Sequence, residues 1–162
     1  MLYQNEALNE IVAVDRFKHL DLSEIDKTFP VKLGSLCEAL GIIAQHDNNL
    51  PAGHSGCLDG NIISFSPHYH PTRQKFTVAH EMAHFIFHGN GNRYDDREKY
   101  TPEERQREVE ANNFAAKLLM PKEEFIKKYN EYKDDYPVAY YFDVSRIAVN
   151  IRAINLGLIN NV

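Results

Sequence analysis

Cysteine is scarce in this chain of 162 residues, which contains only Cys37 and Cys57. Two cysteines are too few for a disulfide framework, and their separation does not match the paired cysteines of a zinc finger. We therefore expect both thiols to be reduced and the protein to be cytoplasmic.

Long apolar runs and an excess of basic residues are also missing. No stretch approaches the ~20 apolar residues of a membrane-spanning helix, and charged side chains interrupt the region where a signal peptide needs an apolar core. Lysine and arginine total 18 against 23 aspartates and glutamates, a formal net charge of −5. Nucleic-acid binding relies on clustered basic side chains against phosphate. We therefore expect neither a membrane nor DNA as a direct partner.

The length predicts one domain, and 43% hydrophobic with 25% charged residues is typical of a globular protein. Residues 1–30 are predicted to form a helical extension, followed by a core over 31–160. A helix from residue 31 ends at Gly41, β-like runs follow to Pro67, and Asp59-Gly60 indicates a hairpin. Further helices are predicted over 72–88, 102–120, 121–132 and 143–156. The fold class is therefore α+β, with the sheet in the first half and helices in the second.

Histidine, by contrast, is abundant, with 8 residues, most of them between residues 46 and 88. The run Phe76 to His88 contains the pattern His-Glu-x-x-His, in which His80 and His84 project from nearly the same face of a helix, about 6 Å apart along its axis. Two such imidazoles can bind one zinc ion. Glu81 lies beside the open coordination position, where a carboxylate can take a proton from water at the metal.

The alternative for this motif is a pair of core histidines with a solvated glutamate between them. The pattern arises by chance only about 0.03 times in a chain of this composition. Its neighbours are apolar nearly all round the helix, which predicts a buried helix, and buried histidines without partners are costly. Both observations favour the metal site.

A catalytic zinc site needs a third protein ligand and one position left for water. The next predicted helix offers Glu108 and Glu110. Both lie on rows of residues that are expected to face inward, so helical periodicity does not decide between them.

Three blocks of sequence carry a resemblance to a known family. They are Arg73-x-x-Phe-Thr-x-Ala-His-Glu-x-x-His, then Glu-Ala-Asn-x-Phe-Ala-Ala-x-Leu-Leu-Met-Pro, then Val144-Ser145-x-x-Ala148-x-x-x-Arg152 and its continuation to Ile159. In this order, over roughly residues 31 to 160, they resemble the ImmA/IrrE family of zinc metallopeptidases. The resemblance implies a zincin-like fold, in which a small, mostly antiparallel sheet packs on a buried metal-binding helix.

The resemblance also implies roles for individual residues. It implies a gluzincin-like site in which Zn²⁺ is bound by His80, His84 and the glutamate just before Ala-Asn, which is Glu110, with Glu81 as the catalytic base. On this assignment Glu108 would be a charged residue beside the site and not a ligand. Asn113 or Asn112 would hydrogen-bond to one of the metal ligands and so fix its orientation.

The remaining histidines allow more than one interpretation. His88 is turned about 80° from His80 on the helix, so we expect it to have a structural or ligand-orienting role. His68 and His70 precede the metal-binding helix, where they either donate to the oxyanion of a tetrahedral intermediate or form a solvated turn.

The chemistry predicted from these residues is hydrolysis of a peptide bond. The resemblance implies an endopeptidase of the short, ImmA-like branch, acting on a regulatory protein such as a helix-turn-helix repressor or antitoxin of a phage or mobile element. An acidic enzyme agrees with a basic partner of this kind. If the strand over residues 61–65 is a sheet edge, an extended substrate could pair with it.

Two other classes of function compete with the peptidase. One is a non-proteolytic, zinc-stabilised binding module of a toxin–antitoxin or repressor pair, against which Glu81 argues, because a structural zinc site has four ligands and needs no base. The other is a DNA-binding regulator that uses residues 143–156, with Arg146 and Arg152, as a recognition helix. Two arginines in an acidic chain support it weakly.

Overall fold

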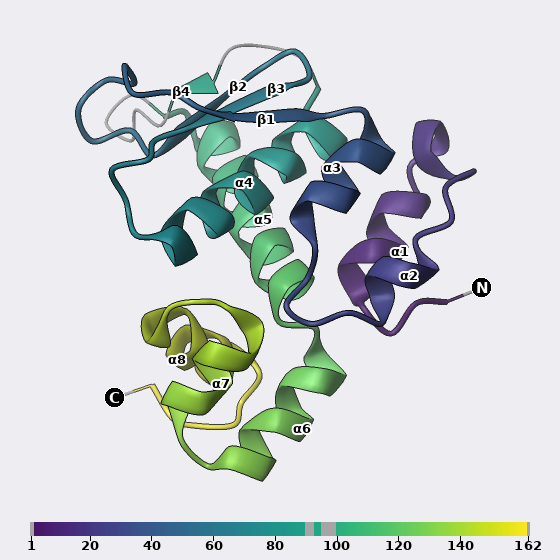
Figure 1. Cartoon of the computed structure of the whole chain (residues 1–162), viewed down its shortest axis with the longest axis vertical. Helices are drawn as coiled ribbons and strands as arrows, with labels where there is room; N and C mark the ends of the chain where they lie inside the picture. The colour runs from purple at the N-terminus through teal and green to yellow at the C-terminus, as the bar shows by residue number, and fades with distance from the viewer. Residues whose placement is uncertain (1, 90–92, 95–99, 162) are drawn as a thin grey trace.

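The computed structural model describes residues 2–89, 93–94 and 100–161. Along these residues the elements are α1 (Glu6–Val12), the 3₁₀ turn η1 (Asp15–Phe17), α2 (Ser23–Asp26), α3 (Leu33–Leu40), β1 (Ile43–His46), β2 (Gly56–Asp59), β3 (Ile62–Phe65), α4 (Pro71–Phe87), β4 (Arg93–Tyr94), α5 (Pro102–Leu119), α6 (Lys122–Tyr132), α7 (Asp135–Phe142) and α8 (Arg146–Asn155) (Figure 1). The α+β class is confirmed, with helices dominating the second half. The polar segment that connects the helices predicted over 72–88 and 102–120 lies mostly outside the described residues.

The sheet has the strand order β1-β3-β2-β4. β2 pairs antiparallel with β3 and with β4, and β1 pairs parallel with β3. Asp59 and Gly60 turn the chain between β2 and β3, as the sequence predicts, and Gly60 has a φ of 61°. Because β3 lies inside the sheet, its backbone groups bond to strands on both sides. Residues 61–65 therefore do not form a sheet edge, and the condition for an extended substrate to pair with them is not met.

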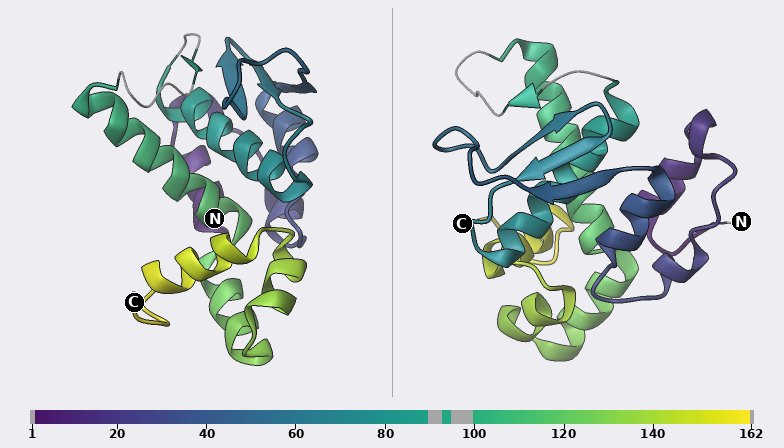
Figure 2. Two further views of the ribbon diagram at one scale, coloured as in Figure 1. Left: turned by 90° about the vertical axis from the view of Figure 1, so that its left-hand side faces the viewer. Right: turned by 45° about the horizontal axis from the view of Figure 1, so that its top comes forward.

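The sheet, α4 and α5 form successive layers (Figure 2, left). α4 packs against β2 and β3 with one side and along α5 with another. Its interior residues Ala79, Met82 and Ala83 are fully buried, which confirms the prediction of a buried helix. α5 begins with a capping box, in which Thr101 and Glu104 each satisfy the other's backbone N–H. These two helices carry the candidate site.

α6, α7 and α8 gather at the end of the molecule away from the sheet (Figure 1). Phe125 of α6 stacks on Phe142 of α7 at a centroid distance of 5.9 Å, and both side chains are fully buried. α7 was not predicted, and α8 begins at Arg146 rather than at residue 143, because Asp143 adopts a left-handed conformation and Ser145 caps the helix. Among the described residues, no helix combines the length and apolar character that a bilayer span requires.

A polar junction joins the first helix to the C-terminal helices. Arg152 of α8 is buried and donates from Nε to the Met120 carbonyl at 3.0 Å and from a terminal nitrogen to Glu6 Oε1 at 2.9 Å. The backbone N–H of Lys122 donates to both Glu6 oxygens at 3.1 Å. Arg152 therefore faces inward, which argues against a role in binding DNA.

Replacing Arg152 with methionine keeps the aliphatic stem but removes these donors. We expect the free energy of unfolding to fall by about 1–3 kcal/mol, because the Met120 carbonyl and Glu6 each lose a charged partner. Urea denaturation measures the loss. The matched control is Lys117→Gln, which breaks the more exposed pair with Glu10 and should cost less than about 1 kcal/mol. Equal losses in the two variants would contradict a special role for the junction.

Candidate metal centre

Three side chains from two helices converge at the interface of α4 and α5. His80 Nε2 lies 2.7 Å from Glu108 Oε2, and His84 Nε2 lies 2.9 Å from Glu108 Oε1. The two Nε2 atoms are 3.2 Å apart. Among the described histidines, cysteines, aspartates and glutamates, this is the one group of three whose possible metal-binding atoms all lie within 4.8 Å of one another. Two imidazoles and a carboxylate are the donor set of a catalytic zinc site.

The outer ring nitrogens of both histidines have partners. His80 Nδ1 lies 2.7 Å from the Asn112 side-chain oxygen, and His84 Nδ1 lies 2.8 Å from His88 Nδ1. An amide oxygen only accepts hydrogen bonds, so Nδ1 of His80 carries a proton. Its Nε2 is then the nitrogen that can offer a lone pair toward the centre of the cluster. The residues therefore fit a metal ion in both chemistry and orientation.

The third residue of the cluster is Glu108, whereas the family resemblance implied Glu110. Two residues along a helix differ by about 200° in direction, so only one of these glutamates can face α4 at this level. Glu110 points instead to His88, with Oε2 2.7 Å from Nε2, and its side chain is half exposed. Of the two asparagines expected to orient a ligand, the structure brings Asn112 to His80, because Asn112 lies four residues beyond Glu108 on the same row; both asparagines are exposed.

Electrostatics at the cluster favour an ionised carboxylate. Burial acts to raise the pKa of Glu108, but hydrogen bonds from His80 and His84 outweigh it and hold that pKa well below its usual range. Burial acts to lower the pKa of His80, but the hydrogen bond with Glu108 and the charge of Glu81 raise it above the ordinary value. The negative charge at this site thus favours bound cations, whether protons or a metal ion, which compete for the same nitrogens.

Glu81 lies close to the sheet. Its side chain is buried, and its Cγ would lie 3.8 Å from a Cβ built on Gly56 of β2. Cys57 follows Gly56 in β2, and its pKa is raised first by burial and second by the negative charge of Glu81. The charge of Glu81 also raises the pKa of His80, so this carboxylate lies near the cluster as well as near the sheet.

Gly56 makes this close approach feasible. A Cβ at position 56 would lie 2.5 Å from Cγ2 of Thr77 and 3.1 Å from the Ser64 carbonyl oxygen. We expect Gly56→Ala to lower stability by about 1–3 kcal/mol through overpacking. Thr77→Ser removes the clashing methyl group, so the double variant should recover much of the loss in thermal unfolding. No recovery would show that the clash with the Ser64 carbonyl of β3 accounts for the loss instead.

The other predicted histidines lie in turns. His70 is the N-cap of α4, where Nδ1 accepts from the Thr72 backbone N–H at 3.2 Å. His68 is exposed, and its backbone N–H donates to Ser66 Oγ at 3.3 Å. Both residues therefore have local structural roles in the turn before α4. The structure does not bring either of them into the cluster.

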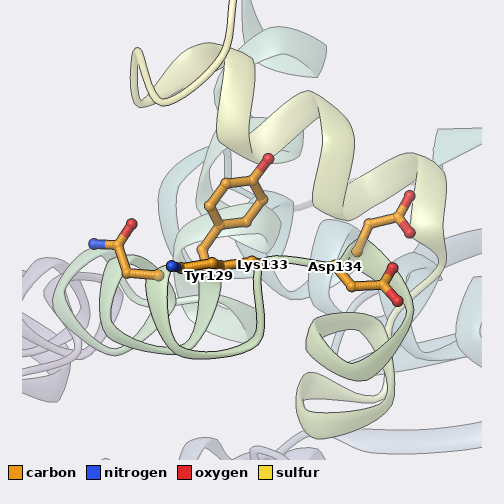
Figure 3. Close-up of a pocket in the computed structure, with 5 residues that line it drawn as sticks. Tyr129, Lys133 and Asp134 are labelled. Carbon is orange, nitrogen blue, oxygen red and sulfur yellow. The ribbon is translucent and has the colours of Figure 1, made fainter.

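A hollow of about 440 Å³, lined by no residue of the cluster, lies at the turn between α6 and α7 (Figure 3). It is lined by Tyr129, Asn130, Lys133, Asp134 and Asp135. Asp134 caps α7 by accepting from the Tyr136 backbone N–H. Asp135 pairs with Arg146 at 3.0 Å. Because both carboxylates serve the local fold, we assign no chemistry to this hollow.

Comparison with known families defines the class of protein. The family model of peptidase M78, described as the IrrE N-terminal-like domain, matches residues 20–153. This match covers most of the chain and includes all the residues of the cluster, so the chain belongs to this family of metallopeptidases, and membership indicates a protease-like function.

Comparison with solved structures supports the fold. The chain is similar to a Mycobacterium tuberculosis transcriptional regulator, with a TM-score of 0.61 and 17% sequence identity. The similarity covers 94% of this chain and 52% of the regulator, so the chain spans about half of that protein's length. None of the curated proteins matches the chain. At 17% identity the likeness shows the fold alone.

Proposed function

We propose that this protein is a zinc-dependent endopeptidase that hydrolyses a peptide bond in a regulatory protein. The observation that carries the proposal is the convergence of His80 Nε2 and His84 Nε2 on Glu108, with the outer nitrogens of both rings engaged elsewhere. These three residues would hold the ion. When bound, zinc supplies Lewis acidity and makes a water molecule nucleophilic near neutral pH.

The chain's own residues supply the proton transfers and the orientation. Glu81, one position beyond His80 and buried against β2, accepts the proton of the attacking water and passes it to the leaving amine. Asn112 holds the ring of His80 through its side-chain oxygen. Three protein ligands leave one position for the reaction, which favours catalysis over a purely structural site.

The proposed substrate is a helix-turn-helix repressor or antitoxin of a phage or mobile element, cleaved in the cytoplasm. The net charge of −5 favours a basic protein partner over direct contact with DNA. α8 would be the recognition helix of the alternative DNA-binding class, but its Arg152 is buried and its Arg146 pairs with Asp135 at 3.0 Å, while Ile147 and Ile151 are exposed. An exposed helix face with isoleucines in place of basic side chains is poorly suited to phosphate.

The experiment is incubation of the purified chain with the repressor encoded beside its gene. Zinc-loaded protein should produce two fragments detected by mass spectrometry, a chelator should stop the cleavage, and added zinc should restore it. Binding without fragments under all three conditions would instead support the non-proteolytic, zinc-stabilised binding module. Cleavage that persists in the chelated protein would contradict the metal-dependent mechanism.

A further inference from the structure

A chain of side-chain contacts leads from His84 to the molecular surface. His84 Nδ1 lies 2.8 Å from His88 Nδ1, and His88 Nε2 lies 2.7 Å from Glu110 Oε2. The side chains of His84 and His88 are 1% and 6% exposed, whereas that of Glu110 is 51% exposed. Glu110 and His88 also line an open hollow of about 410 Å³ beside the first turns of α5. Glu110 is therefore the solvent-exposed end of this series of side-chain contacts.

The direction of each hydrogen bond follows from the chemistry of its acceptor. An ionised carboxylate only accepts, so His88 Nε2 must carry the proton that it shares with Glu110. In a neutral imidazole the other nitrogen is then bare, so His88 Nδ1 is an acceptor. His84 Nδ1 must in turn carry a proton, because two bare nitrogens 2.8 Å apart would repel each other.

We propose that Glu110 and His88 form an orienting pair that fixes His84 in the tautomer protonated on Nδ1 and thereby presents Nε2 to the metal ion. This inference rests on the proposed zinc site. It gives Glu110 a positioning role through His88 in place of the ligand role that the family resemblance implied. The two histidine ligands are thus oriented by different means, His80 by an amide and His84 by a histidine–carboxylate pair.

Orienting partners of metal-binding histidines contribute to affinity without touching the metal. Their loss weakens binding by about 10- to 100-fold. We therefore expect Glu110→Ala to weaken zinc binding by this factor. Glu110→Gln should stay near the wild-type value, because its amide oxygen can still accept from His88 Nε2. Glu103→Ala is the matched control, since Glu103 lines the same hollow but is not part of the chain of contacts.

Two measurements test the pair. Chelator competition gives the zinc dissociation constant of each variant, and ¹⁵N NMR of the zinc-loaded wild type reports the His88 tautomer, expected to be protonated on Nε2. Wild-type affinity in Glu110→Ala, or His88 protonated on Nδ1, would overturn the pair while leaving the zinc site intact. Complete loss of zinc from both Glu110 variants would identify Glu110 as a ligand and overturn the pair as well. Absence of zinc binding in the wild type would overturn the proposed site itself.

Discussion

Glu81→Gln should retain zinc but hydrolyse the substrate about 10²- to 10⁴-fold more slowly than the wild type, the range typical of a lost general base. The amide has nearly the same shape as the carboxylate, so it fits between α4 and β2, but it cannot accept the proton of the attacking water. Initial rates of fragment formation, measured at saturating substrate with equal zinc loading, give the ratio directly.

The controls for Glu81→Gln separate catalysis from folding. Zinc content and thermal unfolding should match the wild type, because Glu81 does not share the cluster of His80, His84 and Glu108. A variant with unchanged zinc and unchanged cleavage rate would show that Glu81 is not the base. A variant that lost zinc would show that the residue contributes to holding the metal.

Glu108→Gln should weaken zinc binding by more than the 10- to 100-fold that follows loss of an orienting group, because it removes the only charged ligand of the cluster. The matched variant is Glu110→Gln, which changes the same group two residues along the same helix. Zinc content after dialysis and chelator competition compare the two. Strong binding in Glu108→Gln together with loss of zinc from Glu110→Gln would contradict the geometry of α5.

Local signals in the sequence account for the parts of the fold that were predicted well. Gly41 ends its helix and Asp59-Gly60 turns the chain as predicted, because left-handed glycines and tight turns act within one turn of the chain. α7 was missed although Asp134 caps its first turn. Its Tyr136 and Tyr140 are exposed, so its pattern does not follow a simple apolar stripe.

The candidate site, too, could be predicted from the sequence only in part. His80 and His84 could be predicted as a pair, because their geometry depends only on the helix that carries them. The choice between Glu108 and Glu110 depends on the rotation of α5 about its own axis as it packs on α4, which is set by contacts across the whole interface. One signal was present in the sequence. Glu108 and Asn112 are four residues apart, the spacing that places two polar groups together on one face.

The position of β3 shows a second limit of the sequence. Strand order depends on pairing between distant residues, and β1 pairs with β3 across a connection that contains β2. Neither the length nor the composition of residues 61–65 distinguishes a central strand from an edge strand.

Anomalous diffraction at the zinc edge, from crystals of the zinc-loaded wild type, tests the proposed centre most directly. The result we predict is one zinc ion bonded to His80 Nε2, His84 Nε2 and a Glu108 carboxylate oxygen, with no fourth protein ligand. An ion bonded to Glu110, or closed off by four protein side chains, would contradict it.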